Sequence, residues 1–202
     1  MRSLIIFGAG GHAKVVADIA LKNGYKIAGF LDDATDIGEV LGYSVLGRVA
    51  DCLKYADEYD FIIGIGNNQV RKRIFETYSE LNYITLIHPT ACVGIDVEVG
   101  LGTVVMPGAV INTGARIGNF CVVNSCAVVE HDCTVGEFTL LAPNSTVCGC
   151  VKIGGNVWLG AGSNVNNGLN ICDGVTVGSG GVVVKNIEVP GTYVGVPVKV
   201  LK

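Results

Sequence analysis

The chain has little charge, little proline and few aromatic residues. Charged side chains make up 16% of its 202 residues and aromatic ones 7%, and there are 5 prolines. Scarce proline, with glycine that follows no three-residue period, excludes a collagen-like chain. No apolar run approaches the ~18–20 residues that a membrane span needs, and the run near the N-terminus is too short for a signal peptide. We therefore expect a cytoplasmic protein that does not bind membranes.

A surplus of basic residues and a zinc-type cysteine spacing are also missing. The formal net charge of −4 argues against a nucleic-acid-binding protein, which needs a basic face. The close cysteine pairs, Cys121/Cys126 and Cys148/Cys150, lack the C-x₂-C spacing of zinc sites, so we expect no metal. We interpret the 8 cysteines as buried, unpaired thiols that serve as small apolar residues.

Glycine is abundant, with 29 residues, and aliphatic residues recur with a period of six. Such a period is typical of a parallel β-helix, in which each short strand points one aliphatic side chain inward. Sixteen hexads at three per coil predict about five coils. The aliphatic positions are Val93, Val99, Val105, Ile111, Ile117, Val123, Val129, Val135, Leu141, Val147, Ile153, Leu159, Val165, Ile171, Val177 and Val183.

The residues around each aliphatic position support this fold. Glycine often follows directly, as at Gly94 and Gly136, which suggests an unusual φ/ψ and no room for a β-carbon. Four residues after the aliphatic position the side chain is usually small or β-branched, as at Cys121 and Cys133, and we expect it to fill a corner of the core. Residues 93–184 also carry few charges. We therefore predict two domains, residues 1–88 and residues 89–202.

The first domain begins with a pattern typical of nucleotide binding. A predicted strand over 3–8 leads into Gly8-Ala9-Gly10-Gly11-His12-Ala13 and a predicted helix over 14–23, and a second strand over 27–31 ends in Asp32-Asp33. In this fingerprint the N–H groups at a helix N-terminus bind the phosphate, and an acidic side chain binds the ribose. A glycine turn that serves only helix–strand packing is the alternative.

The length of this domain favours a small nucleotide ligand over NAD. It offers only two more clear strands, over 60–65 and 83–87, and a complete dinucleotide fold needs two such halves. Half a Rossmann fold suits a mononucleotide or a nucleotide-sugar. Gly66 and Asn67 follow the third strand at the same edge of the sheet and are further candidates for the site. We interpret the basic run 71–73 as a solvated helix face.

His131 is the most informative residue of the hexad region. It lies at the third hexad position, where it points outward, between Glu130 and Asp132 in a stretch with little other charge. Imidazole acts as a general base near neutral pH, and an adjacent carboxylate raises its basicity and fixes its tautomer. A merely solvated surface histidine is the alternative. Of the other histidines, His88 is expected to be structural, and His12 is placed to donate to a phosphate.

Together, GAGGHAKVV, FLDD, IGNNxxRK, NSxxVxEHDxxVGEF and VKNxxxPGxYVGVPVK resemble the bacterial sugar acetyltransferase family, whose members have a left-handed parallel β-helix. The family includes PglD-type acetyltransferases of UDP-4-amino-4,6-dideoxy sugars, perosamine N-acetyltransferases and NeuD-type sialic acid O-acetyltransferases. The resemblance covers nearly the whole chain. It implies a homotrimer, with acetyl-CoA as co-substrate bound between neighbouring β-helices.

The resemblance also implies roles for individual residues. His131 is the implied base and Asp132 the acid that enhances its basicity, where close relatives often carry Glu. The implied nucleotide-sugar contacts are Gly10, Gly11, His12, Asp32, Asp33 and Gly66. The implied acetyl-CoA contacts are Leu140, Ala161 and Ser179, and relatives carry His at the position of Leu140. The segments Pro190-Gly191 and Gly195-Val196-Pro197 resemble the family's closing segment near the adenine.

We therefore expect an acetyl-CoA-dependent N-acetyltransferase acting on the amino group of a nucleotide-linked amino-deoxy sugar. O-acetylation of sialic acid or a related sugar is the alternative within enzymes. A β-helical assembly or carrier protein with a vestigial site is the alternative from another class.

Overall fold

The computed structural model describes residues 3–34 and 38–201. The chain divides into two compact units, Met1–Pro89 and Thr90–Lys202. No helix in the described part is long and apolar enough to cross a membrane.

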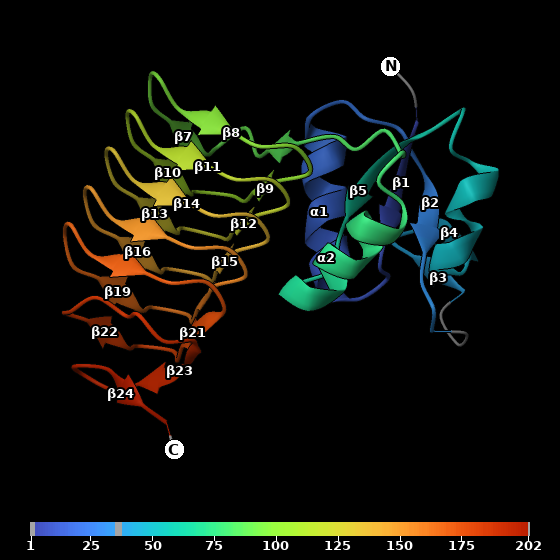
Figure 1. Cartoon of the computed structure of the whole chain (residues 1–202). Coiled ribbons are helices and arrows are strands. Elements are labelled where there is room, and N and C mark those ends of the chain that lie inside the picture. Colours follow the sequence, from blue (N-terminus) through green and yellow to red (C-terminus); the bar gives the residue numbers. More distant parts are fainter. Residues whose placement is uncertain (1–2, 35–37, 202) are drawn as a thin grey trace. The chain divides into compact units, whose positions relative to one another are not determined.

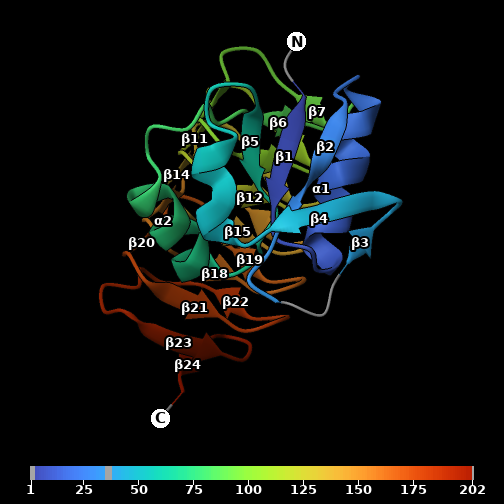
Figure 2. The same cartoon turned by 90° about the vertical axis from the view of Figure 1, so that its right-hand side faces the viewer.

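The first unit is built on a mixed five-stranded sheet in the order β3-β4-β2-β1-β5. Strands β1, β2, β4 and β5 run parallel, and β3 pairs with β4 in an antiparallel hairpin (Figure 2). The predicted half-Rossmann arrangement is thus confirmed. The elements are β1 (Leu4–Phe7), α1 (Gly11–Lys22), β2 (Ile27–Leu31), β3 (Glu39–Val40), β4 (Tyr43–Gly47), the 3-10 helix η1 (Val49–Lys54), β5 (Asp60–Ile63), α2 (Asn68–Thr77) and β6 (Leu86–Ile87).

Helix α1 lies against the sheet through an apolar face with helical spacing. Its buried residues are Ala13, Val16, Ala17, Ile19 and Ala20. A β-carbon on Gly64 would lie 2.9 Å from Cα of Ala13, so the helix approaches the end of β5 closely.

The structure corrects one sequence expectation for this unit and adds one element that the sequence did not indicate. The predicted strand over 83–87 is not continuous: Tyr83 forms a single bridge with Phe61, and β6 covers Leu86–Ile87 only. The hairpin of β3 and β4 was not expected. Most residues of β4 are only half-buried, so the strand lacks the apolar run that marks β1 and β5.

The second unit is a parallel β-helix whose short strands stack in successive coils (Figure 1). Val110 pairs with Val128 and Ile111 with Val129, so each coil contains 18 residues, or three hexads. The first sheet contains β7 (Cys92–Val93), β10 (Val110–Ile111), β13 (Val128–Val129), β16 (Thr146–Val147), β19 (Asn164–Val165) and β22 (Val182–Val183). With six strands in this sheet, the stack is slightly longer than the expected five coils.

The other two faces continue the same pattern. The second sheet contains β8 (Glu98–Val99), β11 (Arg116–Ile117), β14 (Thr134–Val135), β17 (Lys152–Ile153) and β20 (Asn170–Ile171). The third includes β9 (Val104–Val105), β12 (Val122–Val123), β15 (Leu140–Leu141), β18 (Trp158–Leu159), β21 (Val175–Val177), β23 (Gly191–Val194) and β24 (Lys199–Val200).

The core consists of the aliphatic positions that the period predicts. From Val105 to Val183 every one of them is at most 3% exposed, whereas Val93, in the first coil, is 38% exposed. The small corner positions are buried as well. Cys121 and Cys133 lie there, and their thiols donate to the carbonyls of Gly136 and Cys148 at 3.1 Å.

The expectation about the cysteines is correct for pairing and only partly correct for burial. All eight are free thiols, and Cys52, Cys121 and Cys133 are buried. Cys92, Cys126 and Cys150 are exposed, because they occupy strand or turn positions that point away from the core.

The glycines after the aliphatic positions serve close packing between coils. A β-carbon on Gly136 would lie 2.5 Å from the carbonyl carbon of Gly154, and one on Gly160 would lie 2.5 Å from N of Ser179. The unusual φ expected at these glycines occurs two residues later instead. The fourth position of each hexad from Asp96 to Gly180 has positive φ.

Candidate functional site

The glycine-rich turn leaves its backbone accessible at the start of α1. Gly8 has φ +95, a conformation that favours glycine, and Gly10 is the N-cap of α1 without a side-chain cap. β-Carbons on Gly10, Gly11 and Gly66 would have no atom within 4 Å. Open backbone at a helix N-terminus suits an anionic group such as a phosphate.

His12, in the first turn of α1, is half-buried. Burial, together with the charge of Arg71, lowers the pKa of His12 to about 4, so the imidazole is neutral at pH 7. Its Nε2 is buried and has no hydrogen-bond partner in the described residues. The Arg71 guanidinium donates to the carbonyls of Ile65 and Gly66, at 3.2 and 2.8 Å.

The two acids after β2 differ in what they bind. Both carboxylate oxygens of Asp32 accept backbone N–H groups, from Ala9 at 2.6 Å and Ala34 at 2.8 Å. Asp32 thereby connects the end of β2 to the glycine-rich turn through a hydrogen bond. One oxygen of Asp33 accepts from the N–H of Val49 at 3.1 Å, at the start of η1. Asp33 is also the more exposed of the two residues.

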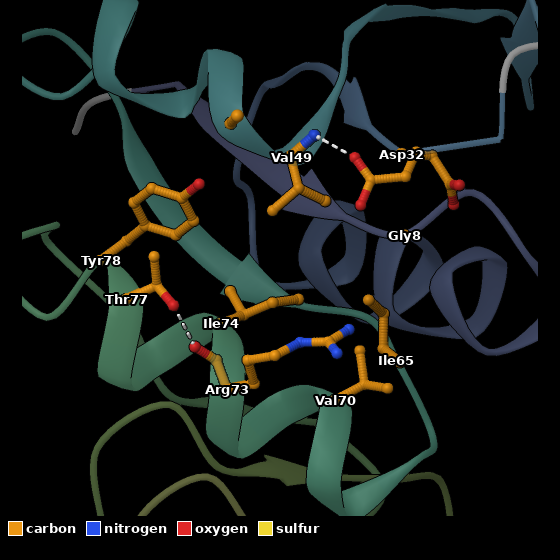
Figure 3. Close-up of a pocket in the computed structure, with 11 residues that line it drawn as sticks. Gly8, Asp32, Val49, Ile65, Val70, Arg73, Ile74, Thr77 and Tyr78 are labelled. Atoms are coloured by element: carbon orange, nitrogen blue, oxygen red, sulfur yellow. Dashed lines mark hydrogen bonds between the residues drawn. The ribbon is translucent and has the colours of Figure 1, made fainter.

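A pocket of about 400 Å³ opens at this edge of the sheet (Figure 3). Such a volume is in the range of small-molecule sites, and parallel sheets bind ligands beyond the carboxyl ends of their strands. Its polar side chains are those of Asp32, Asp33, Arg73, Thr77 and Tyr78, and its other side chains are aliphatic. The lining residues are Gly8, Asp32, Asp33, Val49, Ala50, Ile65, Val70, Arg73, Ile74, Thr77 and Tyr78.

The basic run of α2 is not one solvated face. Arg71 is 1% exposed and bonded as described above, and the Arg73 side chain points into the pocket (Figure 3). The other two residues of the run fit the expectation, because Arg73 is exposed at the pocket and Lys72 is partly exposed, with its Nζ 3.8 Å from Oε1 of Glu76. Consecutive helical residues point about 100° apart, so neighbours of identical charge reach different surroundings.

The pocket combines residues that the sequence indicated with others that it did not. Asp32 and Asp33 line it, whereas Gly10, Gly11, His12 and Gly66 do not. Arg73 and Tyr78 were missed, because a basic or aromatic residue on a helix carries no pattern that separates a ligand contact from a surface or core position. Arg73 and Tyr78 lie five and ten residues after Asn68, the last residue of the IGNN turn, and this spacing gives no such signal.

In the second unit His131 and Asp132 lie in the turn between β13 and β14. Nδ1 of His131 lies 2.9 Å from Oδ2 of Asp132, and the two side chains are 51% and 65% exposed. Asp132 has φ +59, which aspartate tolerates better than most residues. The carboxylate therefore engages one ring nitrogen and leaves the other available for chemistry.

Residues of the next coil complete the surroundings of His131. Gly149 lies one coil away, and a β-carbon there would come 2.6 Å from Nε2 of His131. The N–H of Cys150 donates to the His131 carbonyl at 3.0 Å. His131, Asp132 and Cys150 each offer a metal-ligand atom, and these atoms lie within 4.8 Å of one another.

The three residues implied in acetyl-CoA binding lie on other parts of the β-helix. Ala161 and Ser179 are exposed in turns of successive coils, joined by a 2.8 Å hydrogen bond from the N–H of Gly180 to the carbonyl of Ala161. Leu140 lies in β15 beside Trp158 of β18 and is 4% exposed.

Comparison with known proteins identifies the family. Residues 3–78 match the family model of the PglD N-terminal domain. The whole chain is similar to the solved acetyltransferase domain of PglB from Neisseria gonorrhoeae, with 35% identity, a TM-score of 0.95 and full coverage of both chains. The chain belongs to the PglD-like family of sugar acetyltransferases.

Members of this family have been solved with bound ligands. The same PglB domain has been solved with acetyl coenzyme A, at 35% identity, TM-score 0.94 and 99% coverage of both chains. PerB from Caulobacter crescentus, solved with CoA and GDP-perosamine, is 33% identical with a TM-score of 0.94, and the match covers 100% of this chain and 98% of PerB.

Matches to curated proteins are partial. The UDP-N-acetylbacillosamine N-acetyltransferase of Bacillus subtilis is 34% identical over 110 residues, which is 52% of this chain and 51% of that protein. The uncharacterized protein L142 of Acanthamoeba polyphaga mimivirus is 38% identical over 94 residues, 46% of this chain and 19% of that protein. The matched regions thus span about a fifth to a half of the length of these curated relatives.

Proposed function

We propose that this protein transfers the acetyl group of acetyl-CoA to the amino group of a nucleotide-linked amino-deoxy sugar, such as a UDP-4-amino-4,6-dideoxy sugar. The contact between His131 and Asp132 carries the proposal. It is an exposed imidazole with a carboxylate on Nδ1, which is the arrangement that general-base catalysis needs.

The reaction is a direct transfer with His131 as base. Asp132 accepts the hydrogen bond from Nδ1–H and so keeps the lone pair on Nε2. Nε2 takes a proton from the sugar amine as its nitrogen attacks the thioester carbonyl. The C–N bond forms, the C–S bond breaks, and the departing CoA thiolate receives the proton from the imidazolium. The products are the acetamido sugar and CoA.

The pocket of the first unit supports a nucleotide-bearing acceptor. Its aliphatic walls suit a nucleobase, the Asp33 carboxylate is placed to accept from a base N–H or a ribose hydroxyl, and Arg73 supplies a cation for the diphosphate. Gly10, Gly11 and Gly66 leave open backbone, and the buried Nε2 of His12 lacks a protein partner in the described residues. The nucleotide-sugars named for PerB and for the B. subtilis relative point the same way.

The donor site is part of the same proposal. Ala161 and Ser179 are small and exposed on neighbouring turns, which suits a ligand lying along the coil edge. Leu140 fits less well, because it is buried and offers an apolar surface where relatives carry His. We include the homotrimer in the proposal, with acetyl-CoA between adjacent β-helices. The mass of the assembly in solution, measured by light scattering, tests the trimer.

The decisive experiment is an acetylation assay over a panel of acceptors. The full chain is incubated with acetyl-CoA and UDP-, dTDP- and GDP-linked amino sugars or free sialic acids, and the products are identified by mass spectrometry. Direct product detection avoids thiol reagents, which would also react with the exposed Cys92, Cys126 and Cys150. We expect acetylation of a nucleotide-linked amino sugar, with a loss of about 10²–10⁴-fold in rate for His131→Ala.

Two outcomes would contradict the proposal. Acetylation of free sialic acids alone would establish O-acetylation in its place. A rate unchanged by His131→Ala would exclude the base mechanism.

A further inference from the structure

Cys150 and Asp132 occupy the same position in successive coils of the β-helix. They are 18 residues apart, both hold the fourth position of their hexads, and their φ values are +61 and +59. Neighbouring strands lie about 4.8 Å apart, so side chains at equivalent turn positions emerge one strand spacing from each other. The hydrogen bond from the Cys150 N–H to the His131 carbonyl, at 3.0 Å, fixes this stacking.

The third member of the cluster reaches the same place because Gly149 has no side chain. The His131 ring occupies the space that a β-carbon on Gly149 would need. An imidazole nitrogen, a carboxylate oxygen and a thiol sulfur therefore lie within 4.8 Å of one another, and all three residues are exposed. Ligand atoms of a tetrahedral zinc ion lie about 3.5 Å apart, so small side-chain rotations close the site.

The chemistry of the three ligand atoms indicates which class of metal ion would bind. Nitrogen, sulfur and a single carboxylate suit a borderline-soft divalent cation such as Zn²⁺, whereas Mg²⁺ and Ca²⁺ require several oxygen ligands. Three protein ligands leave the fourth tetrahedral position to water.

We propose that His131, Asp132 and Cys150 form a Zn²⁺-binding site and that occupation of this site inhibits the enzyme. Binding releases the Cys150 proton to solvent as the thiolate forms. A metal on Nδ1 displaces the proton shared with Asp132 and leaves the ring proton on Nε2, while a metal on Nε2 occupies that lone pair directly. In either case the ring has no lone pair with which to accept the proton of the acceptor. The inhibitory part rests on the proposed function of His131, and the binding part does not.

The binding test uses Co²⁺ as a spectroscopic substitute for Zn²⁺ and needs no activity. The full chain, reduced and freed of metal, is titrated with Co²⁺, and a cobalt–thiolate bond gives a charge-transfer band in the near ultraviolet. We expect this band in the unmodified protein, its loss in Cys150→Ala, and its retention in Cys126→Ala. Cys126 is a matched control, because it too is exposed, at a fourth hexad position with φ +55.

Each result of the titration decides the binding part. No thiolate band in the unmodified protein, or a band that persists in Cys150→Ala, overturns the site. Loss of the band in Cys126→Ala but not in Cys150→Ala places the metal elsewhere and also overturns it.

The inhibition test measures acetylation by mass spectrometry with Zn²⁺ or Mg²⁺ added. We expect Zn²⁺ but not Mg²⁺ to inhibit, and Cys150→Ala to raise the half-inhibitory Zn²⁺ concentration at least about tenfold. Equal Zn²⁺ sensitivity in both proteins overturns the inhibitory part. A protein that acetylates none of the acceptors contradicts the proposed function instead, and the Co²⁺ titration still decides the metal site.

Discussion

The imidazole of His131 lies where a side chain on Gly149 would have to be, with Nε2 2.6 Å from the position of the missing β-carbon. Gly149→Ala should therefore push the ring away from its position. A displacement of about 1 Å at a reacting group costs about 10²-fold in rate, which we expect in kcat for acetyl transfer.

The control for this variant is Gly155→Ala. Gly155 also holds the third position of its hexad, and the atom nearest to its added β-carbon is the Glu137 carbonyl oxygen at 3.3 Å. Its kcat should stay near that of the unmodified protein. Equal losses in the two variants would indicate a general distortion of the coil.

Removal of the Asp132 carboxylate should weaken the base without disturbing the turn. Asn tolerates the positive φ of this position as well as Asp does, so Asp132→Asn should fold normally. The amide no longer fixes the productive tautomer of His131, and we expect kcat to fall about 10²-fold. Asp96→Asn is the matched control, since Asp96 holds the same hexad position with φ +56. An unchanged kcat in Asp132→Asn would remove Asp132 from the mechanism.

Asp32 and Asp33 should separate into a structural and a binding residue. In Asp32→Asn one oxygen acceptor is lost from a carboxylate that holds two backbone N–H groups, so we expect the free energy of unfolding to fall by about 1–2 kcal/mol. In Asp33→Asn a charged contact to the nucleotide is lost, and KM for the nucleotide-sugar should rise about 10–100-fold. Urea unfolding and steady-state kinetics measure the two effects, and the reverse assignment would contradict our interpretation of the pocket.

Arg73 should contribute to binding and not to the chemical step. Arg73→Gln removes the pocket's cation, and we expect KM for the nucleotide-sugar to rise about tenfold or more with kcat nearly unchanged. Lys72→Gln is the control, because Lys72 is the neighbouring basic residue and does not line the pocket. If both variants raise KM equally, the contribution of this helix is only its net charge.

The depressed pKa of His12 should make the protein less stable in acid. The unfolded chain binds a proton at His12 near pH 6.5, whereas the folded protein binds it only near pH 4. Between these values the unfolded state holds more protons, so stability falls as the pH decreases from about 6.5 to about 4. His12→Gln should lessen this loss by an amount on the order of 2–3 kcal/mol, measured by urea unfolding across this pH range. An identical pH dependence in the variant would show that His12 is not shielded.

The β-helix and its core could be predicted from the period of six alone. A period of six assigns each residue to the inside, the corner or the outside of a coil, so the buried aliphatic positions, the inward thiols of Cys121 and Cys133 and the outward His131 all follow from counting. The glycine-rich turn and the acids after the second strand likewise indicated the edge of the sheet where the pocket lies.

Which side chains come into contact depends on the folded chain and could not be predicted from the sequence. The period places His131, Gly149 and Cys150 on one corner, but the direction of each side chain and the free space over Gly149 depend on packing between coils. In the first unit, Asp32 and Asp33 are adjacent in sequence and both line the pocket, but Asp32 accepts two backbone N–H groups and Asp33 accepts one. Arg71 and Arg73 also have different surroundings, because they lie on different sides of α2. Arg71 donates to the buried carbonyl of Gly66, and Arg73 lines the pocket.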